Sequence, residues 1–206
     1  ERNMKIICIG RNYKQHISEL KNEIPKEIIF FLKPETAIPQ KKQPFFIPDF
    51  SQEIHHEIEL VIKINKTGKH IQEKFAHTYY DEVTLGLDFT ARDVQNKLKE
   101  DGEPWEKAKA FDGSAPVGLF INKNDIKNLN NLNFTLLINN KEKQRGNTKN
   151  MIFKIDYIIS YISRFITLKK GDLIFTGTPH GVNKVKKNDI LIGFIENQKI
   201  LEIKIK

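Results

Sequence analysis

The sequence is poor in cysteine and in long apolar segments. Cys8 is the single cysteine among its 206 residues, so no disulfide can form within the chain. No apolar run approaches the roughly 20 residues that a membrane-spanning helix needs. Residues 4–10 are too short and too soon interrupted to resemble a signal peptide. These absences are compatible with a reducing compartment, and we expect a cytoplasmic protein without a membrane partner.

Repeats, low-complexity tracts and long linkers are also missing from the sequence. Hydrophobic residues make up 39% and charged residues 29%, and these values argue against disorder. A chain of this length can bury a substantial core. We therefore predict one domain over residues 1–206, and give no structural weight to residues 1–3, which precede Met4.

The formal net charge is +8, an excess that can mark a nucleic-acid-binding protein. The basic residues are mostly lysines, spread along the whole chain and mixed with acids, and the densest run, 141–145, is expected at a hairpin tip. This distribution favours solvated surface lysines, and a nucleic-acid partner stays a remote alternative. A basic field would also concentrate a dianionic small molecule near the protein.

Short strands dominate the predicted secondary structure. Residues 57–64 alternate aliphatic and other side chains with the period of a strand, whereas the isoleucines of residues 155–166 recur at helical spacing. Further strands are expected at residues 6–9, 28–32, 85–90, 114–121, 134–138, 173–176, 189–195 and 199–205. A loop with a helical turn is expected at 12–20 and a helix at 73–83. The predicted fold class is a mixed α/β, β-rich domain.

Two glutamates lie two positions apart in the strand at residues 57–64. Glu57 and Glu59 therefore point to the same face of that strand. Adjacent carboxylates raise each other's pKa unless a cation holds them together, and a hard divalent cation with oxygen ligands explains the pair. The alternative is an exposed strand face with ordinary acids. His55 and His56 do not indicate zinc, because neither a cysteine cluster nor a His-Glu-x-x-His spacing accompanies them.

A third carboxylate, Asp88, is flanked by apolar residues in the segment Leu87-Asp88-Phe89. A buried aspartate needs a partner or a metal ion. Three carboxylates would leave about half of an octahedral Mg²⁺ shell open to water or substrate, which is the layout of a catalytic site. The nearby Arg92 and Asp93 have a plainer interpretation as an ion pair at a helix start.

Three further segments carry groups that catalysis can use. His16 and Glu19 are neighbours on a helical turn, where a carboxylate orients an imidazole and makes it a better base; an incidental surface pair is the alternative. Lys109 lies between two alanines, and a partly buried lysine can stabilise an enolate or bind a carboxylate. Residues 175–182 form a strand and a glycine-rich loop whose N–H groups can hold an anion, although a plain turn explains the glycines equally well.

In this order, the segments resemble the fumarylacetoacetate hydrolase family, most closely its small single-domain acylpyruvate hydrolase and oxaloacetate decarboxylase members. The resemblance extends over residues 5–203. Its specificity comes from the glutamate pair, the later aspartate and the Thr-Gly-Thr-Pro block together. The matching blocks are residues 9–13 with His16 and Glu19, 56–60, 87–95, 104–105 with Lys109, and 171–182.

This resemblance implies a β-roll or sandwich with a few short helices, a homodimer, and Mg²⁺ or Mn²⁺ as the cofactor. The implied metal ligands are Glu57, Glu59 and Asp88. The implied catalytic groups are His16 and Glu19, a water-activating dyad on a mobile lid, and Lys109, which faces the substrate. The implied substrate-binding residues are Arg11, Arg92, Gln95, Gly177 and Thr178.

The activity expected first is hydrolysis of the carbon–carbon bond of acylpyruvate-type 2,4-dioxo acids, with oxaloacetate decarboxylation beside it. The same metal site would serve an oxaloacetate keto–enol tautomerase or a 2-oxo-diacid isomerase, and the resemblance does not separate these reactions. In each case the partner is a small 2-oxo acid.

Overall fold

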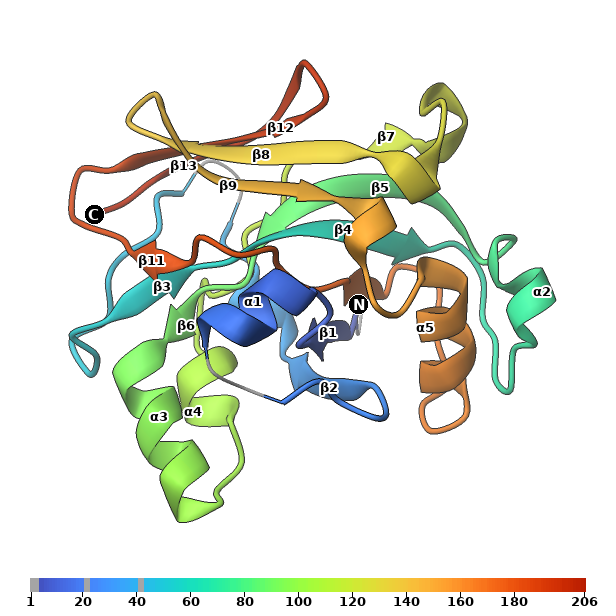
Figure 1. Ribbon diagram of the computed structural model, residues 1–206, viewed down its shortest axis with the longest axis horizontal. Helices are drawn as coiled ribbons and strands as arrows, with labels where there is room; N and C mark the ends of the chain where they lie inside the picture. The colour runs from blue at the N-terminus through green and yellow to red at the C-terminus, as the bar shows by residue number, and fades with distance from the viewer. Residues whose placement is uncertain (1–3, 21–22, 41–42) are drawn as a thin grey trace.

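The computed structural model describes residues 4–20, 23–40 and 43–206. Its centre is a mixed six-stranded sheet with the strand order β2-β1-β10-β4-β5-β7 (Figure 1). β1 pairs parallel with β10, and the other pairs in this sheet are antiparallel. Its strands are β1 (Ile6–Gly10), β2 (Ile29–Lys33), β4 (Ile58–Ile64), β5 (Tyr80–Leu87), β7 (Ile121–Asn122) and β10 (Leu173–Phe175).

Two smaller sheets accompany this central one. An antiparallel four-stranded sheet, in the order β13-β12-β8-β9, packs over β4 and β5 (Figure 1). A short three-stranded sheet, β11-β3-β6, continues beyond β4. Their strands are β8 (Asn133–Ile138), β9 (Lys141–Asn147), β12 (Ile190–Ile195), β13 (Gln198–Lys204), β3 (Ile54–His56), β6 (Thr90–Ala91) and β11 (Asn183–Lys184).

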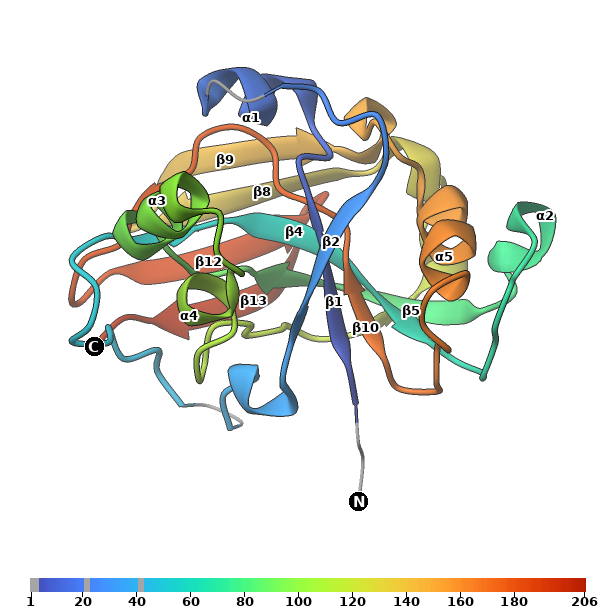
Figure 2. The same ribbon diagram turned by 90° about the horizontal axis from the view of Figure 1, so that it is seen from below.

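The helices lie at the edges of the sheets. α3 (Arg92–Asp101) and α4 (Glu106–Lys109) lie side by side at one end, and α5 (Ile155–Ser163) lies with α2 (Glu73–Ala76) at the other (Figure 2). α1 (Lys14–Glu19) follows β1. The remaining short 3₁₀ turns are η1 (Glu35–Ala37), η2 (Lys123–Asp125), η3 (Leu129–Asn131) and η4 (Thr148–Asn150).

The alternation along β4 divides its side chains between two environments. Ile58, Leu60, Ile62 and Ile64 enter the main core between the two large sheets. Burial of each of these side chains stabilises the fold by about 1.5–3 kcal/mol of transfer free energy. Val61 points the other way, into a smaller apolar cluster on the opposite face. Glu57 and Glu59 share the face of Val61, so the strand period that fills the core also places both carboxylates on one side.

The predicted fold class, a mixed α/β and β-rich arrangement with few short helices, is confirmed. The run 141–145, expected at a hairpin tip, lies instead in β9, and the tip is formed by Asn139 and Asn140, with φ of 51° and 64°. The helix predicted over residues 73–83 is wrong beyond Ala76. From Tyr80 onward the chain pairs with β4 instead, because a helix there would leave the backbone groups of that buried strand without partners.

Two other predicted strands are shorter than expected. The strand at 85–90 is interrupted after Leu87, so that Asp88 and Phe89 belong to no strand. Between residues 114 and 121 only an isolated bridge at Val117 and the start of β7 are strand-like. Pro116 explains part of this, because proline has no N–H for a ladder. Within the described residues, no helix has both the length and the apolarity needed to cross a bilayer.

Candidate active site

The three predicted metal ligands converge at one end of the β4–β5 pair. These strands run antiparallel with Ile58 opposite Leu87, so the preceding Glu57 and the following Asp88 face each other. The Asp88 N–H donates to the Glu57 carbonyl at 2.9 Å, which fixes this register. Glu59 stands two residues along on the face of Glu57. One carboxylate oxygen from each of the three residues lies within 4.8 Å of the others, and all three residues are buried.

Glu57 is the most strongly paired of the three acids. Its Oε2 accepts a hydrogen bond from Lys109 Nζ at 2.9 Å, and its Oε1 accepts one from the Arg92 guanidinium. Burial acts to raise the pKa of Glu57, but the charges of Lys109 and Arg92 outweigh it and hold that pKa well below the usual range. Glu57 is therefore an anion in the folded protein.

Asp88 lies between two buried lysines. Lys109 Nζ donates to Asp88 Oδ2 at 2.7 Å and to Thr90 Oγ1 at 2.6 Å. Lys33 Nζ lies 2.8 Å from Asp88 Oδ1, but its direction is outside hydrogen-bond geometry, so this contact is electrostatic and Oδ1 accepts no hydrogen bond from the described residues. Burial lowers the pKa of Lys109, yet Asp88 and Glu57 together raise it above its ordinary value.

Glu59 has no such cation. Its Oε2 accepts a hydrogen bond from the Gly177 N–H at 2.6 Å, and none of the ion pairs among the described residues includes it. Burial raises the pKa of Glu59 well above the usual range, and the neighbouring Asp88 and Glu57 charges raise it further. This carboxyl group is the one that a further cation would stabilise.

A divalent cation fits this donor set. The donors are carboxylate oxygens, which suit Mg²⁺ and Mn²⁺, and neither cysteine nor histidine belongs to the cluster. One feature of the structure favours added positive charge: Glu59 is buried and has no ion-pair partner among the described residues. Glu57, Glu59 and Asp88 are the residues that would hold the ion.

His16 of the predicted dyad lines one cavity together with the three acids, and Glu19 lies behind it. His16 Nδ1 and Glu19 Oε2 are 3.1 Å apart across one turn of α1, and the Gly181 N–H donates to Glu19 Oε1 at 2.9 Å. Burial acts to raise the pKa of Glu19, but the hydrogen bonds from His16 and Gly181 outweigh it and the net shift is downward. A carboxylate at this position orients the imidazole.

The start of α1 is anchored to the glycine-rich loop by Asn12. This fully buried side chain donates to the Thr176 carbonyl at 2.8 Å and to the Phe153 carbonyl at 3.0 Å. Gly177 follows with φ of 99°, and a Cβ there would lie 2.7 Å from Asn12 Cβ, so only glycine fits. Two segments distant in sequence are thereby locked together, one carrying His16 and the other the donor to Glu59.

Four of the five residues predicted to bind substrate line this cavity. Its walls are formed by Ile9, Gly10, Arg11, His16, Leu20, Phe31, Glu57, Glu59, Asp88, Arg92, Gln95, Lys99, Trp105, Lys109 and Thr178. Gly177 does not line it, because its N–H is directed to Glu59. The alternative pairing of Arg92 with Asp93 is also wrong: Arg92 contacts Glu57 and donates to Gln95 Oε1 at 2.6 Å, while Asp93 accepts from Ser51.

Two buried residues near the site were missed from the sequence. Lys33 is 2% exposed at the end of β2, and a lone lysine closing the apolar run Phe-Phe-Leu-Lys was the available signal. Gln144 is 1% exposed in β9, where it accepts from the Ile58 N–H and from His56 Nδ1 and donates to Thr178 Oγ1. Nothing in the run Lys-Glu-Lys-Gln-Arg distinguishes Gln144 from exposed neighbours.

The Lys33 contact predicts a large loss of stability. Lys33→Met should lower the free energy of unfolding of the metal-free protein by about 3–5 kcal/mol, because it breaks a buried ion pair and leaves Ser114 without its donor. Urea denaturation measures the change. Lys199→Met, which breaks an exposed pair with Glu202, is the control and should cost less than about 1 kcal/mol. Equal losses of unfolding free energy in the two variants would contradict the buried ion pair between Lys33 and Asp88.

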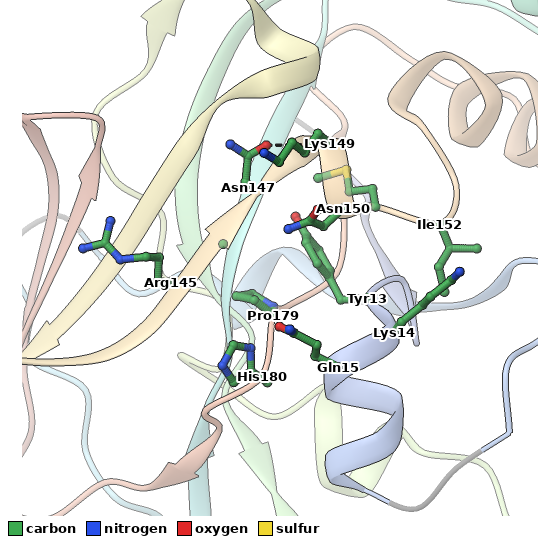
Figure 3. Close-up of a pocket in the computed structure, with 12 residues that line it drawn as sticks. Tyr13, Lys14, Gln15, Arg145, Asn147, Lys149, Asn150, Ile152, Pro179 and His180 are labelled. Carbon is green, nitrogen blue, oxygen red and sulfur yellow. Dashed lines mark hydrogen bonds between the residues drawn. The ribbon is translucent and has the colours of Figure 1, made fainter.

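A larger groove lies outside the carboxylate site. Figure 3 shows it between the start of α1, the end of β9 and the loop with Pro179 and His180; its volume is about 580 Å³. Arg145, Lys14 and His180 are among its lining residues, and none of the three carboxylates is. The groove is therefore distinct from the cluster in which the chemistry is concentrated.

The β-rich fold and the three buried acids near His16 and Glu19 agree with the class of enzymes that the sequence motifs resemble, the fumarylacetoacetate hydrolases. Residues 5–203 match the family described as Fumarylacetoacetate (FAA) hydrolase C-terminal, and the chain belongs to this family. The resemblance inferred from the sequence motifs is thus confirmed.

Two curated relatives and one solved structure show the level of similarity. The chain is 42% identical over 201 residues to oxaloacetate tautomerase FAHD1, mitochondrial, of Mus musculus, covering 98% of this chain and 91% of the relative. It is 46% identical over 192 residues to oxaloacetate decarboxylase, mitochondrial, of Dictyostelium discoideum, covering 93% and 88%. Fumarylpyruvate hydrolase from Pseudomonas aeruginosa, in complex with Mn²⁺ and pyruvate, is similar with a TM-score of 0.92 and 33% identity, covering 98% and 89%.

Proposed function

We propose that this chain is a Mg²⁺- or Mn²⁺-dependent enzyme of small dicarboxylic 2-oxo acids, with keto–enol tautomerisation of oxaloacetate as its main reaction. The observation that carries the proposal is the convergence of three buried carboxylates and the His16 imidazole on one cavity. The relatives at 42–46% identity are an oxaloacetate tautomerase and an oxaloacetate decarboxylase, which supports tautomerisation and decarboxylation ahead of hydrolysis. We therefore propose tautomerisation as the main reaction, although the sequence motifs alone favoured acylpyruvate hydrolysis.

The reaction needs a polarised oxo group and a base. A bound Mg²⁺ or Mn²⁺ would supply Lewis acidity at the 2-oxo group of the substrate. His16, oriented by Glu19, would take the proton from C3 of the keto form. The C2 oxygen of the resulting enolate would take up a proton from water to give the enol, and the enol-to-keto direction would reverse both transfers. Lys109, held by Glu57 and Asp88, would place its positive charge near the developing enolate oxygen.

Substrate entry requires one wall to move. The cavity has a volume of about 40 Å³, far below the roughly 300–1,000 Å³ of usual ligand pockets. Its walls come from the strand ends, from α3 and α4, and from α1 with the residues around it. We propose that α1 opens about its start, which Asn12 anchors, because its far end carries the partly exposed Glu19 and is connected to the loop by the hydrogen bond from the Gly181 N–H.

A second candidate reaction is acylpyruvate hydrolysis. The His16–Glu19 dyad would equally activate a water molecule for attack on the distal carbonyl, and the fumarylpyruvate hydrolase with a TM-score of 0.92 favours this reading. Decarboxylation of oxaloacetate needs only the electron sink at the oxo group and would accompany either reaction.

A substrate panel separates these reactions. The protein should be assayed with enol-oxaloacetate, keto-oxaloacetate and an acylpyruvate, each with Mg²⁺ and with a chelator. We expect kcat/KM for enol-to-keto conversion to exceed that for acylpyruvate cleavage by at least about tenfold, since proton transfer to one carbon is the simpler demand on a single base. A faster acylpyruvate cleavage would put hydrolysis first.

A further inference from the structure

The cavity contains two cations that the carboxylate cluster does not use. Lys109 and Arg92 are paired with Glu57 and Asp88. Arg11 and Lys99 line the same cavity, but neither side chain makes an ion pair or hydrogen bond with any of the residues that the structure describes. Positive charge without an anionic partner in a substrate cavity is the feature to be explained.

Lys99 is directed to the cavity by the helix that carries Arg92 and Gln95. These three residues stand at positions i, i+3 and i+7 of α3, which share one helix face. The ammonium group lies 5.6 Å from the centre of the Trp105 ring, and Trp105 packs edge-on against Phe31. Contact with the Trp105 ring restricts the conformations of the Lys99 side chain, so less conformational entropy is lost when a ligand binds.

Arg11 lines the same cavity from the end of β1. It follows β1 directly and has φ of 57°, a left-handed conformation that is unusual for a residue other than glycine, asparagine or aspartate. Strained backbone of this kind persists where the surroundings impose it and is common at ligand sites. Its guanidinium and the Lys99 ammonium both border the cavity without a carboxylate of their own.

We propose that Lys99, assisted by Arg11, binds the distal carboxylate of the substrate and makes the site selective for dicarboxylic over monocarboxylic 2-oxo acids. The inference rests on the proposed function, which places the oxo end of the substrate at the carboxylate cluster. Pyruvate and oxaloacetate differ by exactly one carboxylate, so a residue that contacts only the distal group affects one and spares the other.

The charge of Lys99 adds a pH signature. Burial, with Arg92 and Arg11 next, lowers the pKa of Lys99 to about 8; Lys109 acts in the same direction and Glu57 opposes it. The ammonium form is present below that pH and is lost as the pH rises through it. The distal carboxylate should therefore be held at neutral pH and released in mildly alkaline solution, whereas an arginine at position 99 would keep its charge.

The test compares Lys99→Met with Lys99→Arg and with Lys97→Met, an exposed lysine on the same helix. The readouts are KM and kcat for oxaloacetate and the inhibition constant of pyruvate, all with Mg²⁺, at pH 7 and pH 9. Lys99→Met should raise KM for oxaloacetate about 10- to 100-fold, the range for losing a hydrogen bond to a charged group, with kcat changed less. Its pyruvate inhibition constant should stay within about twofold of wild type.

The variants distinguish the possible results. Lys97→Met should match wild type, and Lys99→Arg should abolish the rise in oxaloacetate KM between pH 7 and pH 9. If Lys99→Met changes oxaloacetate and pyruvate by the same factor, the inference is overturned while the proposed function stands. If the wild-type protein neither converts oxaloacetate nor is inhibited by pyruvate, the proposed function fails, and the inference fails with it.

Discussion

Glu59→Gln will abolish turnover without weakening the metal-free fold. The substitution keeps the shape of the side chain and an oxygen that can accept from the Gly177 N–H. It removes the one acid of the cluster that has no cation and whose pKa is raised by burial and by Asp88 and Glu57. A buried carboxyl with a raised pKa destabilises the folded state at neutral pH, so its neutral isostere should unfold at the same or a higher temperature.

The loss of activity should be large because a metal ligand disappears. We expect kcat/KM for oxaloacetate to fall at least about 10³-fold and Mn²⁺ affinity to fall by at least about tenfold. Glu57→Gln is the matched comparison. It should also inactivate, but it leaves Arg92 and Lys109 short of a partner and should lower the melting temperature. Calorimetry in the presence of a chelator measures the melting temperature, and titration with Mn²⁺ measures the affinity for the ion. A Glu59→Gln protein that binds Mn²⁺ normally would exclude Glu59 as a ligand.

His16→Ala will slow enol–keto conversion of oxaloacetate by about 10²–10⁴-fold, the usual contribution of a general base. Acylpyruvate cleavage should fall similarly, because water attack needs the same base. Oxaloacetate decarboxylation should retain a larger fraction of its rate, since carbon dioxide leaves without proton abstraction. Steady-state kinetics on the three reactions give the comparison, with kcat and KM separated because a change in α1 closure would alter both.

Two controls make the His16 result interpretable. His180→Ala removes an exposed imidazole of the neighbouring loop that is outside the carboxylate cavity, and it should retain near wild-type rates. Glu19→Gln keeps a hydrogen-bond acceptor for His16 but removes the charge, so an intermediate loss is expected. Equal, small losses in all three reactions for His16→Ala would show that another group supplies the base.

Much of this fold could be predicted from local pattern because its strands are short and strongly alternating. β4 and the helix α5 were recognisable from their periods of two and about 3.6 residues. The first part of β5 was not, because Glu73 to Val83 also fits a helical pattern and only the pairing with β4 decides between helix and strand. Long-range pairing is a tertiary effect that single-segment propensity does not contain.

The candidate site, like the fold, could be predicted from the sequence only in part. The spacing of Glu57 and Glu59 on a strand is a local property and was readable from sequence. The register that brings Asp88 to them, and the burial of Lys33 and Gln144 behind them, depend on segments more than 20 residues apart in the chain. The homodimer and the cytoplasmic location remain predictions of the sequence analysis.

The central claim is that the carboxylate cluster holds a divalent ion on which the chemistry of a 2-oxo diacid depends. The most direct measurement is the rate of enol-oxaloacetate conversion by chelator-treated protein, before and after Mg²⁺ or Mn²⁺ is restored, with the uncatalysed rate subtracted. We expect the chelated protein to have lost nearly all activity and to regain it as one ion binds per chain. Undiminished conversion by protein shown to be free of metal would contradict it.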